Sequence, residues 1–276
     1  MKDNNIYKPK TKAEVSYKVW IQASYFDDFA RIFIPNHPFD KLKSGEEART
    51  TAYTSLHNDK ENQEDNIERS IRRSVKNIKG YVWCNRFDLF ATFTFREDRQ
   101  DIDKCKKKMS NWLKNRQKRN GAFRYLIIPE FHEDGNSLHF HAMLGGYTGK
   151  LVESENPKTG KLITQKGRQV YEFPGYTLGF TNVQRIGDKR DDQRRTGYYL
   201  MKYITKDMPL FSSKNRYWVS SGLKRPIVED NPETWYLNRP FDRSYETEWG
   251  IVNEYDNVTY DSVTHPTNPS REERGY

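Results

Sequence analysis

Hydrophobic and polar residues alternate most regularly over residues 87–95. The odd positions of this segment are apolar, and threonines occupy two of its even positions. Because successive side chains of a strand point to opposite faces, the pattern predicts a strand with one buried face. A helical period follows over residues 101–119 and ends before Gly121, a residue typical of helix C-termini. The apolar stripe of this predicted helix consists of Ile102, Cys105, Met109, Trp112 and Leu113.

A hairpin is predicted next, with strands over residues 123–131 and 138–144 and a turn at Asp134-Gly135. A two-residue turn at that position would place Glu130 opposite His139. One face of the hairpin would then be apolar. The other face would carry Glu130, His132, His139 and His141. A register shift of one residue would destroy this separation.

The other elements follow from the same kind of pattern. We expect a hairpin at 15–34, a loop at 36–64, a helix at 66–78, a strand at 179–186, a helix at 191–207 and a strand at 216–221. Residues 147–176 are an elaboration with a small hairpin at Lys166-Gly167. This order predicts an α+β fold, in which a central antiparallel sheet has helices on one face in a split β-α-β arrangement with added hairpins.

The chain divides into three expected parts. Residues 1–64 form an N-terminal hairpin and loop extension, residues 65–226 form the central domain, and residues 227–276 form a partly disordered C-terminal extension. The boundaries follow changes in polarity and in the density of predicted elements.

Composition adds a partner class. The net charge is +9 and the pI is about 9.3, a balance that favours a polyanion such as nucleic acid. The N-terminus lacks the apolar run of a signal peptide, and no segment is long and apolar enough to cross a membrane. We therefore expect a soluble cytoplasmic protein without a membrane partner. The two cysteines, Cys84 and Cys105, lack metal-binding spacing and predict reduced thiols.

The polar face of the hairpin predicts a metal site. Glu130, His139 and His141 supply one carboxylate and two imidazoles, which leave open coordination positions for water and a phosphate oxygen. This donor set suits Mg²⁺ or Mn²⁺, although Zn²⁺ could also bind. Three roles stay open for His132: a fourth ligand, a DNA contact or an exposed side chain.

A second constellation lies on the predicted helix at 191–207. Tyr199, Lys202, Tyr203 and Lys206 have the spacing of one helical face. The simplest interpretation is an amphipathic helix with half-buried tyrosines and lysines that reach to water. Beside a metal site, the same residues favour a nucleophile helix, because a phenol becomes reactive in a positive environment. Tyr198 would point about 100° away from that face.

Three segments resemble the motifs of the HUH endonucleases that initiate rolling-circle replication. Phe90–Phe95 is similar to the hydrophobic first motif and Pro129–Leu144 to the His-hydrophobic-His second motif. Tyr199–Lys206 resembles the two-tyrosine third motif, YxxKYxxK, of phage initiators. The resemblance covers roughly residues 65–226 and is best to the replication proteins of small phages and plasmids, including filamentous-phage gene II-type proteins.

The resemblance implies metal-dependent, site-specific nicking and rejoining of single-stranded or supercoiled origin DNA through a 5′-phosphotyrosine. His139 and His141 would ligate the metal with Glu130 as the third ligand. Tyr199 and Tyr203 would be nucleophiles, and Lys202 and Lys206 would hold phosphate. A helicase and a polymerase would come from the host, because the segment Gly145–Leu151 fails the nucleotide-binding GxxxxGK[ST] pattern.

Two other functions compete with this one. A non-catalytic protein could bind single-stranded nucleic acid through basic and aromatic residues. Candidate DNA contacts under either function are His132, Arg216 and Trp218. An HUH relaxase or transposase would share the chemistry, but relaxases usually carry three clustered histidines and an N-terminal tyrosine.

Overall fold

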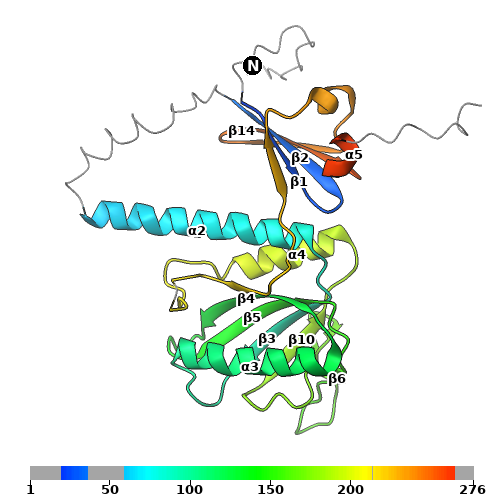
Figure 1. The fold of residues 1–276 in the computed structure, drawn as a ribbon. Coiled ribbons are helices and arrows are strands. Elements are labelled where there is room, and N and C mark those ends of the chain that lie inside the picture. Colours follow the sequence, from blue (N-terminus) through cyan, green and yellow to red (C-terminus); the bar gives the residue numbers. More distant parts are fainter. Residues whose placement is uncertain (1–19, 37–58, 213, 265–276) are drawn as a thin grey trace, which may run out of the picture. The chain divides into compact units, whose positions relative to one another are not determined.

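The computed structural model describes residues 20–36, 59–212 and 214–264. Two compact units divide the chain (Figure 1). One consists of residues 59–224, and the other combines residues 1–58 with residues 225–276. Among the described residues, no helix is long and apolar enough to span a membrane.

A seven-stranded antiparallel sheet forms the centre of the unit at 59–224, with the strand order β11-β4-β5-β3-β10-β9-β6. The strands are β3 (Leu89–Thr94), β4 (Arg124–Phe131), β5 (Leu138–Gly145), β6 (Val152–Glu153), β9 (Tyr171–Glu172), β10 (Thr181–Arg185) and β11 (Trp218–Val219). The predicted α+β class with a central antiparallel sheet is confirmed.

Helix α3 (Ile102–Asn120) covers the apolar face of this sheet. The Asp101 carboxylate caps its first turn by accepting hydrogen bonds from the amides of Asp103 and Lys104. Its apolar stripe is buried against Phe93 and Phe140, as the alternation predicts. The face that this core leaves uncovered is the polar face with the histidines.

Helices α2 (Asp59–Cys84) and α4 (Arg190–Met201) pack together in the same unit. The end of α4 lies on the polar face, because the ring of Tyr199 packs edge-on against Phe90 of β3, with ring centroids 5.4 Å apart. Helices thus lie on both faces of the sheet, whereas the sequence analysis expected them on one (Figure 1). Period alone does not tell a helix which face of a sheet it will cover.

The β4–β5 hairpin has the predicted register, with Glu130 opposite His139. Its connection is longer than a two-residue turn, since regular pairing stops at Phe131 and Leu138. Asp134 stabilises this loop by accepting hydrogen bonds from the amide and the hydroxyl of Ser137. These bonds hold the pKa of Asp134 well below its usual range.

A separate small hairpin consists of β7 (Thr164–Gln165) and β8 (Arg168–Gln169). Its turn residues, Lys166 and Gly167, both have positive φ angles, 51° and 76°. Two such residues in succession give the backbone twist that a tight hairpin needs. The hairpin predicted at Lys166-Gly167 is confirmed.

The other unit is a five-stranded antiparallel sheet with the order β12-β1-β2-β14-β13. Its elements are β1 (Gln22–Tyr25), β2 (Phe29–Pro35), β12 (Ile227–Asp230), the 3-10 helix η1 (Thr234–Asn238), β13 (Arg243–Thr247), β14 (Gly250–Asp256) and α5 (Tyr260–Thr264). The N-terminal hairpin is confirmed over β1 and β2. The two predicted extensions are not separate, because residues 227–264 complete the sheet that this hairpin begins.

Other boundaries differ from the predictions. Helix α2 begins at Asp59, so part of the loop expected at 36–64 is helical, and the helix continues past the predicted end to Cys84. The expectations for 1–14 and for the disordered tail lie outside the described residues, apart from the tail's ordered beginning at 227–264. Cys84 and Cys105 are buried free thiols, and burial raises the pKa of Cys105 to about 12.

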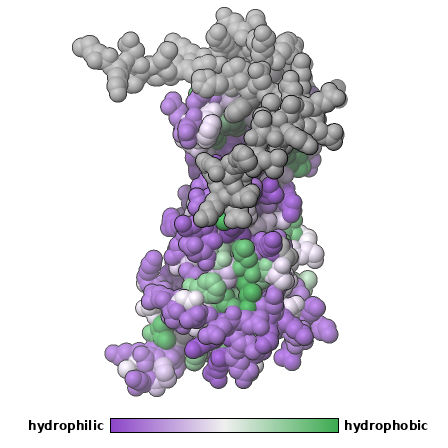
Figure 2. All heavy atoms as spheres, turned by 90° about the vertical axis from the view of Figure 1, so that its left-hand side faces the viewer, coloured by the Kyte–Doolittle hydropathy of each residue, from purple (hydrophilic) through white to green (hydrophobic). Residues whose placement is uncertain are grey.

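The exposed surface agrees with the low mean hydropathy of −1.03. Figure 2 shows hydrophilic residues over most of the visible face of the unit at 59–224, around a smaller gathering of hydrophobic ones. Apolar side chains therefore lie mainly in the cores.

Candidate active site

The three predicted metal ligands lie together on the polar face of the β4–β5 hairpin. One ligand atom from each of Glu130, His139 and His141 lies within 4.8 Å of the others. The cross-strand pair of Glu130 and His139 brings the carboxylate to the imidazoles, and His141 is two residues further along the same face. A carboxylate and two imidazoles are a donor set that suits a divalent cation.

The surroundings of His141 fit this role. Its Nδ1 lies 3.1 Å from Thr92 Oγ1, and its Nε2 lies 2.6 Å from Glu130 Oε2. An imidazole that donates from Nδ1 to Thr92 presents a lone pair at Nε2, and fixing the tautomer in this way is typical of metal-binding histidines. Two electron-rich atoms at 2.6 Å need a proton or a cation beside them. The site therefore has the chemistry of a cation site.

His139 is also suited to metal binding. Burial and the neighbouring imidazoles of His132 and His141 lower the pKa of His139, which keeps this side chain neutral and able to donate a lone pair. His132 is exposed, and its ring centroid lies 4.7 Å from that of His139. His132 thus borders the cluster at the hairpin loop.

The tyrosine pair contacts the metal cluster directly. The ring of Tyr203 stacks on His141 with centroids 3.9 Å apart and an interplanar angle of 3°. The hydroxyl of Tyr203 donates a hydrogen bond of 2.9 Å to the hydroxyl of Tyr199. Burial and this bond raise the pKa of Tyr203. The two phenol oxygens therefore lie side by side next to the cluster.

The predicted helix at 191–207 is too long, since α4 ends at Met201. Hydrogen bonds from the amide of Tyr203 to Leu200 O and from the amide of Ile204 to Met201 O continue the chain as a tighter turn. Tyr203 nevertheless stays next to Tyr199, because this turn keeps nearly the helical spacing. Lys206 follows the turn rather than the helix.

Lys202 is the lysine that lies against the tyrosines. Its Nζ is 4.0 Å from the ring centroid of Tyr199 and 4.7 Å from that of Tyr203. Lys206 is exposed beyond this turn. An ammonium group over both rings supplies the positive environment that a phenol nucleophile needs.

Tyr198 lies elsewhere, as predicted. Its ring packs edge-on against Trp83 of α2, with centroids 6.3 Å apart, and Lys79 lies over it. Half of its surface is exposed. Tyr198 therefore offers a matched control for the two site tyrosines.

Two of the candidate DNA contacts have other positions. Arg216 is buried, with its Nη1 donating to the carbonyl of Thr205 at 2.5 Å and its Nε donating to Ser70 Oγ at 3.4 Å. It holds the turn after the tyrosines rather than facing solvent. Trp218 is partly buried against the core under α3, on the face opposite the histidines, and Lys106 lies over its ring.

Two site residues had no role in the sequence analysis. Thr92 contacts His141, and Phe90 contacts both Tyr199 and the ring of His141 at 6.1 Å. Their alternation placed them on the polar side of the strand. Only the pairing of β3 with β5 puts Thr92 opposite His141, and the two segments are about 50 residues apart in the chain.

Residues 88–208 match a family model of replication-associated proteins, the family of the ORF2 and gene II proteins. The matched segment begins before β3 and includes the metal cluster and both tyrosines. It supports a replication initiator protein. No curated protein and no solved structure matches the chain.

Proposed function

We propose that this replication-associated protein is an HUH-type endonuclease that initiates rolling-circle replication. It cuts one strand of origin DNA and later rejoins it through a 5′-phosphotyrosine. The observation that carries the proposal is the contact of two adjacent phenols with the ligand cluster: Tyr203 stacks on His141 and bonds to Tyr199.

The chemistry is a phosphoryl transfer. The phenol oxygen of Tyr199 or Tyr203 forms a bond to phosphorus, the bond from phosphorus to the 3′ oxygen breaks, and that oxygen takes up a proton as the free 3′ hydroxyl. The energy of the phosphodiester is kept in the phosphotyrosine, so the reverse transfer rejoins a strand. Lys202, over both rings, stabilises negative charge on the phenol oxygens.

Glu130, His139 and His141 are the residues that would hold a divalent cation, Mg²⁺ or Mn²⁺. Bound there, the cation supplies positive charge for the phosphate oxygens as the transfer proceeds. The hydroxyl of Thr92 keeps His141 oriented toward it. The implied partners are origin DNA and a host helicase and polymerase.

The test is covalent capture on single-stranded origin oligonucleotides and nicking of supercoiled parent replicon DNA. The double variant Tyr199→Phe with Tyr203→Phe should form no adduct and still bind DNA, since Phe keeps the ring packing. Tyr198→Phe is the matched control and should form the adduct normally. An adduct that persists in the double variant would refute the proposal, and binding without any adduct in the unaltered protein would favour a non-catalytic single-strand binder.

The metal cluster is tested separately. His139→Ala combined with His141→Ala should abolish nicking and leave DNA binding largely intact, because the ligands act on the phosphate rather than on the fold. His132→Ala is the control on the same loop. Nicking that survives both the double change and chelation would overturn the metal assignment.

A further inference from the structure

A hollow of about 460 Å³ lies beside Tyr199 on the polar face of the sheet. Its walls come from β3, β10, α4 and the small β7–β8 hairpin. Among the described residues that line it there is no carboxylate, and the basic ones are Lys166, Arg168, Arg185 and Arg195. This charge suits an anionic strand that reaches the tyrosines.

Three side-chain amides meet in this hollow. The Oε1 of Gln165 accepts hydrogen bonds from Gln184 Nε2 at 2.7 Å and from Asn182 Nδ2 at 3.4 Å. Two donors on one oxygen fix which end of each amide points where. In the part of the chain that the structure describes, the amide nitrogen of Gln165 and the amide oxygen of Gln184 have no hydrogen-bond partner.

We propose that this hollow binds an adenine of the DNA strand next to the bond that is cut. An amide donor beside an amide acceptor matches adenine, whose N7 accepts and whose N6 amino group donates. Gln165 would donate to N7 and Gln184 would accept from N6. The inference rests on the proposed function and deepens it, because it gives the site a sequence preference.

A neighbouring aromatic residue extends the same track. Phe180 is 68% exposed and precedes β10, on the same face as Asn182 and Gln184. Its backbone pairs with Thr94 of β3, the residue opposite His139. Arg96 lies over its ring, 5.2 Å from the centroid. An exposed ring between the amides and the ligand strand is a platform on which a second base stacks.

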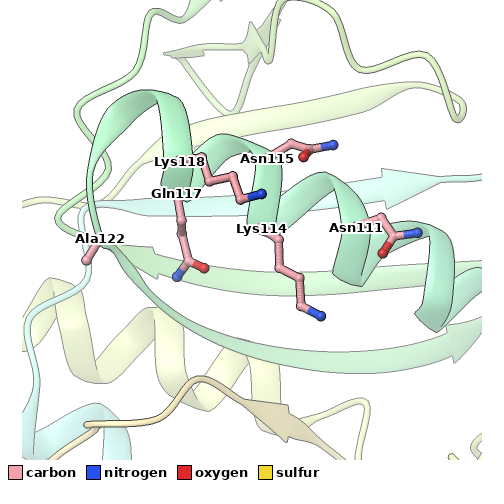
Figure 3. A pocket seen from close by; sticks show the side chains of 6 residues that line it. All are labelled: Asn111, Lys114, Asn115, Gln117, Lys118 and Ala122. Atoms are coloured by element: carbon pink, nitrogen blue, oxygen red, sulfur yellow. The ribbon is translucent and has the colours of Figure 1, made fainter.

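A second hollow has similar residue types at a different place. Figure 3 shows Lys114, Asn115 and Lys118 on the exposed side of α3, where they extend separately from the helix. This helix covers the sheet face opposite the histidines. Asn115 is therefore a matched control: an exposed amide among lysines, remote from the tyrosines.

The experiment is selection from a random single-stranded DNA library by the full-length protein, followed by sequencing of the bound strands. The unaltered protein should select adenine at one position. Gln165→Ala and Gln184→Ala should each reduce that preference by about tenfold. Phe180→Ala should weaken binding of all sequences by about tenfold without changing the preference. Asn115→Ala should change neither.

The outcomes separate this inference from the proposed function. An unaltered protein that selects no adenine, or a preference that survives both glutamine changes, would overturn it even if the tyrosine adduct forms normally. A preference lost only in Asn115→Ala would assign base reading to α3 instead. Adenine selection that depends on Gln165 and Gln184, without any covalent adduct, would support the base site and refute the nickase.

Discussion

The two site tyrosines are not equivalent. Tyr199 is 41% exposed, whereas Tyr203 is 8% exposed and stacked on His141. Tyr203 also donates its hydroxyl proton to the oxygen of Tyr199, which stabilises negative charge there. We therefore expect Tyr199 to make the first attack and Tyr203 to accept the strand in a second transfer.

Single substitutions test this order. Tyr203→Phe removes a donated hydrogen bond worth about 1 kcal/mol, so first-strand cleavage should slow by about fivefold. Tyr199→Phe removes the exposed nucleophile and should slow it far more, with the residual adduct on Tyr203. Single-turnover cleavage with peptide mapping of the adduct measures both. Equal rates for the two variants, or an adduct first on Tyr203 in the unaltered protein, would contradict the order.

Arg216 gives a second prediction at this scale. The change Arg216→Met leaves the Thr205 carbonyl without its buried donor, which should cost about 1–3 kcal/mol of unfolding free energy and slow nicking. Urea denaturation measures the first effect. The salt dependence of DNA binding should not change, because a buried guanidinium makes no phosphate contact.

The control for Arg216 is an exposed basic residue of the hollow. Arg168→Ala should leave the unfolding free energy unchanged and should make DNA binding less dependent on salt. If Arg216→Met reduced the salt dependence instead, Arg216 would be a DNA contact after all.

Among the elements, the β4–β5 hairpin was predictable and the end of α4 was not. A strict alternation around Glu130 and His139 allows only one register, since a shift would bury the histidines. The spacing of Tyr199 and Tyr203 fits both a longer helix and the tighter turn that the structure has. Local pattern therefore predicted their proximity but not the backbone that produces it.

The crossing of α2 and α4 leads to a prediction about Gly197. A methyl group at Gly197 would lie 2.6 Å from a methyl of Val82. Gly→Ala in a helix usually stabilises by roughly 0.5–1 kcal/mol, but this overlap should reverse the sign and destabilise by about 1–3 kcal/mol. Thermal or urea unfolding measures the change, and nicking should also fall because α4 carries Tyr199.

A double-mutant cycle provides the control. Val82→Ala alone leaves a small cavity, whereas Gly197→Ala combined with Val82→Ala makes room for the new methyl group. The double variant should be more stable than the sum of the single effects predicts. Strict additivity would show that Val82 does not limit the approach of the two helices.

At the scale of the whole molecule, the division into units depends on pairing that local pattern does not reveal. The strand β1 pairs with β12, and β2 pairs with β14, across more than 200 residues of chain. Both ends look like extensions when read separately. The central unit was predictable in class because its motifs, strands and helices follow one another in order.

The separate cores lead to a final prediction about truncation. The core of the sheet with β1 and β2 includes Tyr236 and Tyr255 from the C-terminal segment, whereas the core of the other unit lies within 59–224. A chain ending at Lys224 would leave β1 and β2 as a lone two-stranded hairpin, which is marginally stable at best. Limited proteolysis should then cut at 20–36 much faster than in the full chain. The tyrosine adduct should still form, because every ligand and both nucleophiles lie in the remaining unit. Equal protection of 20–36 in both chains would show that the hairpin does not need its C-terminal strands, and loss of the adduct in a folded truncated protein would show that the chemistry requires both units.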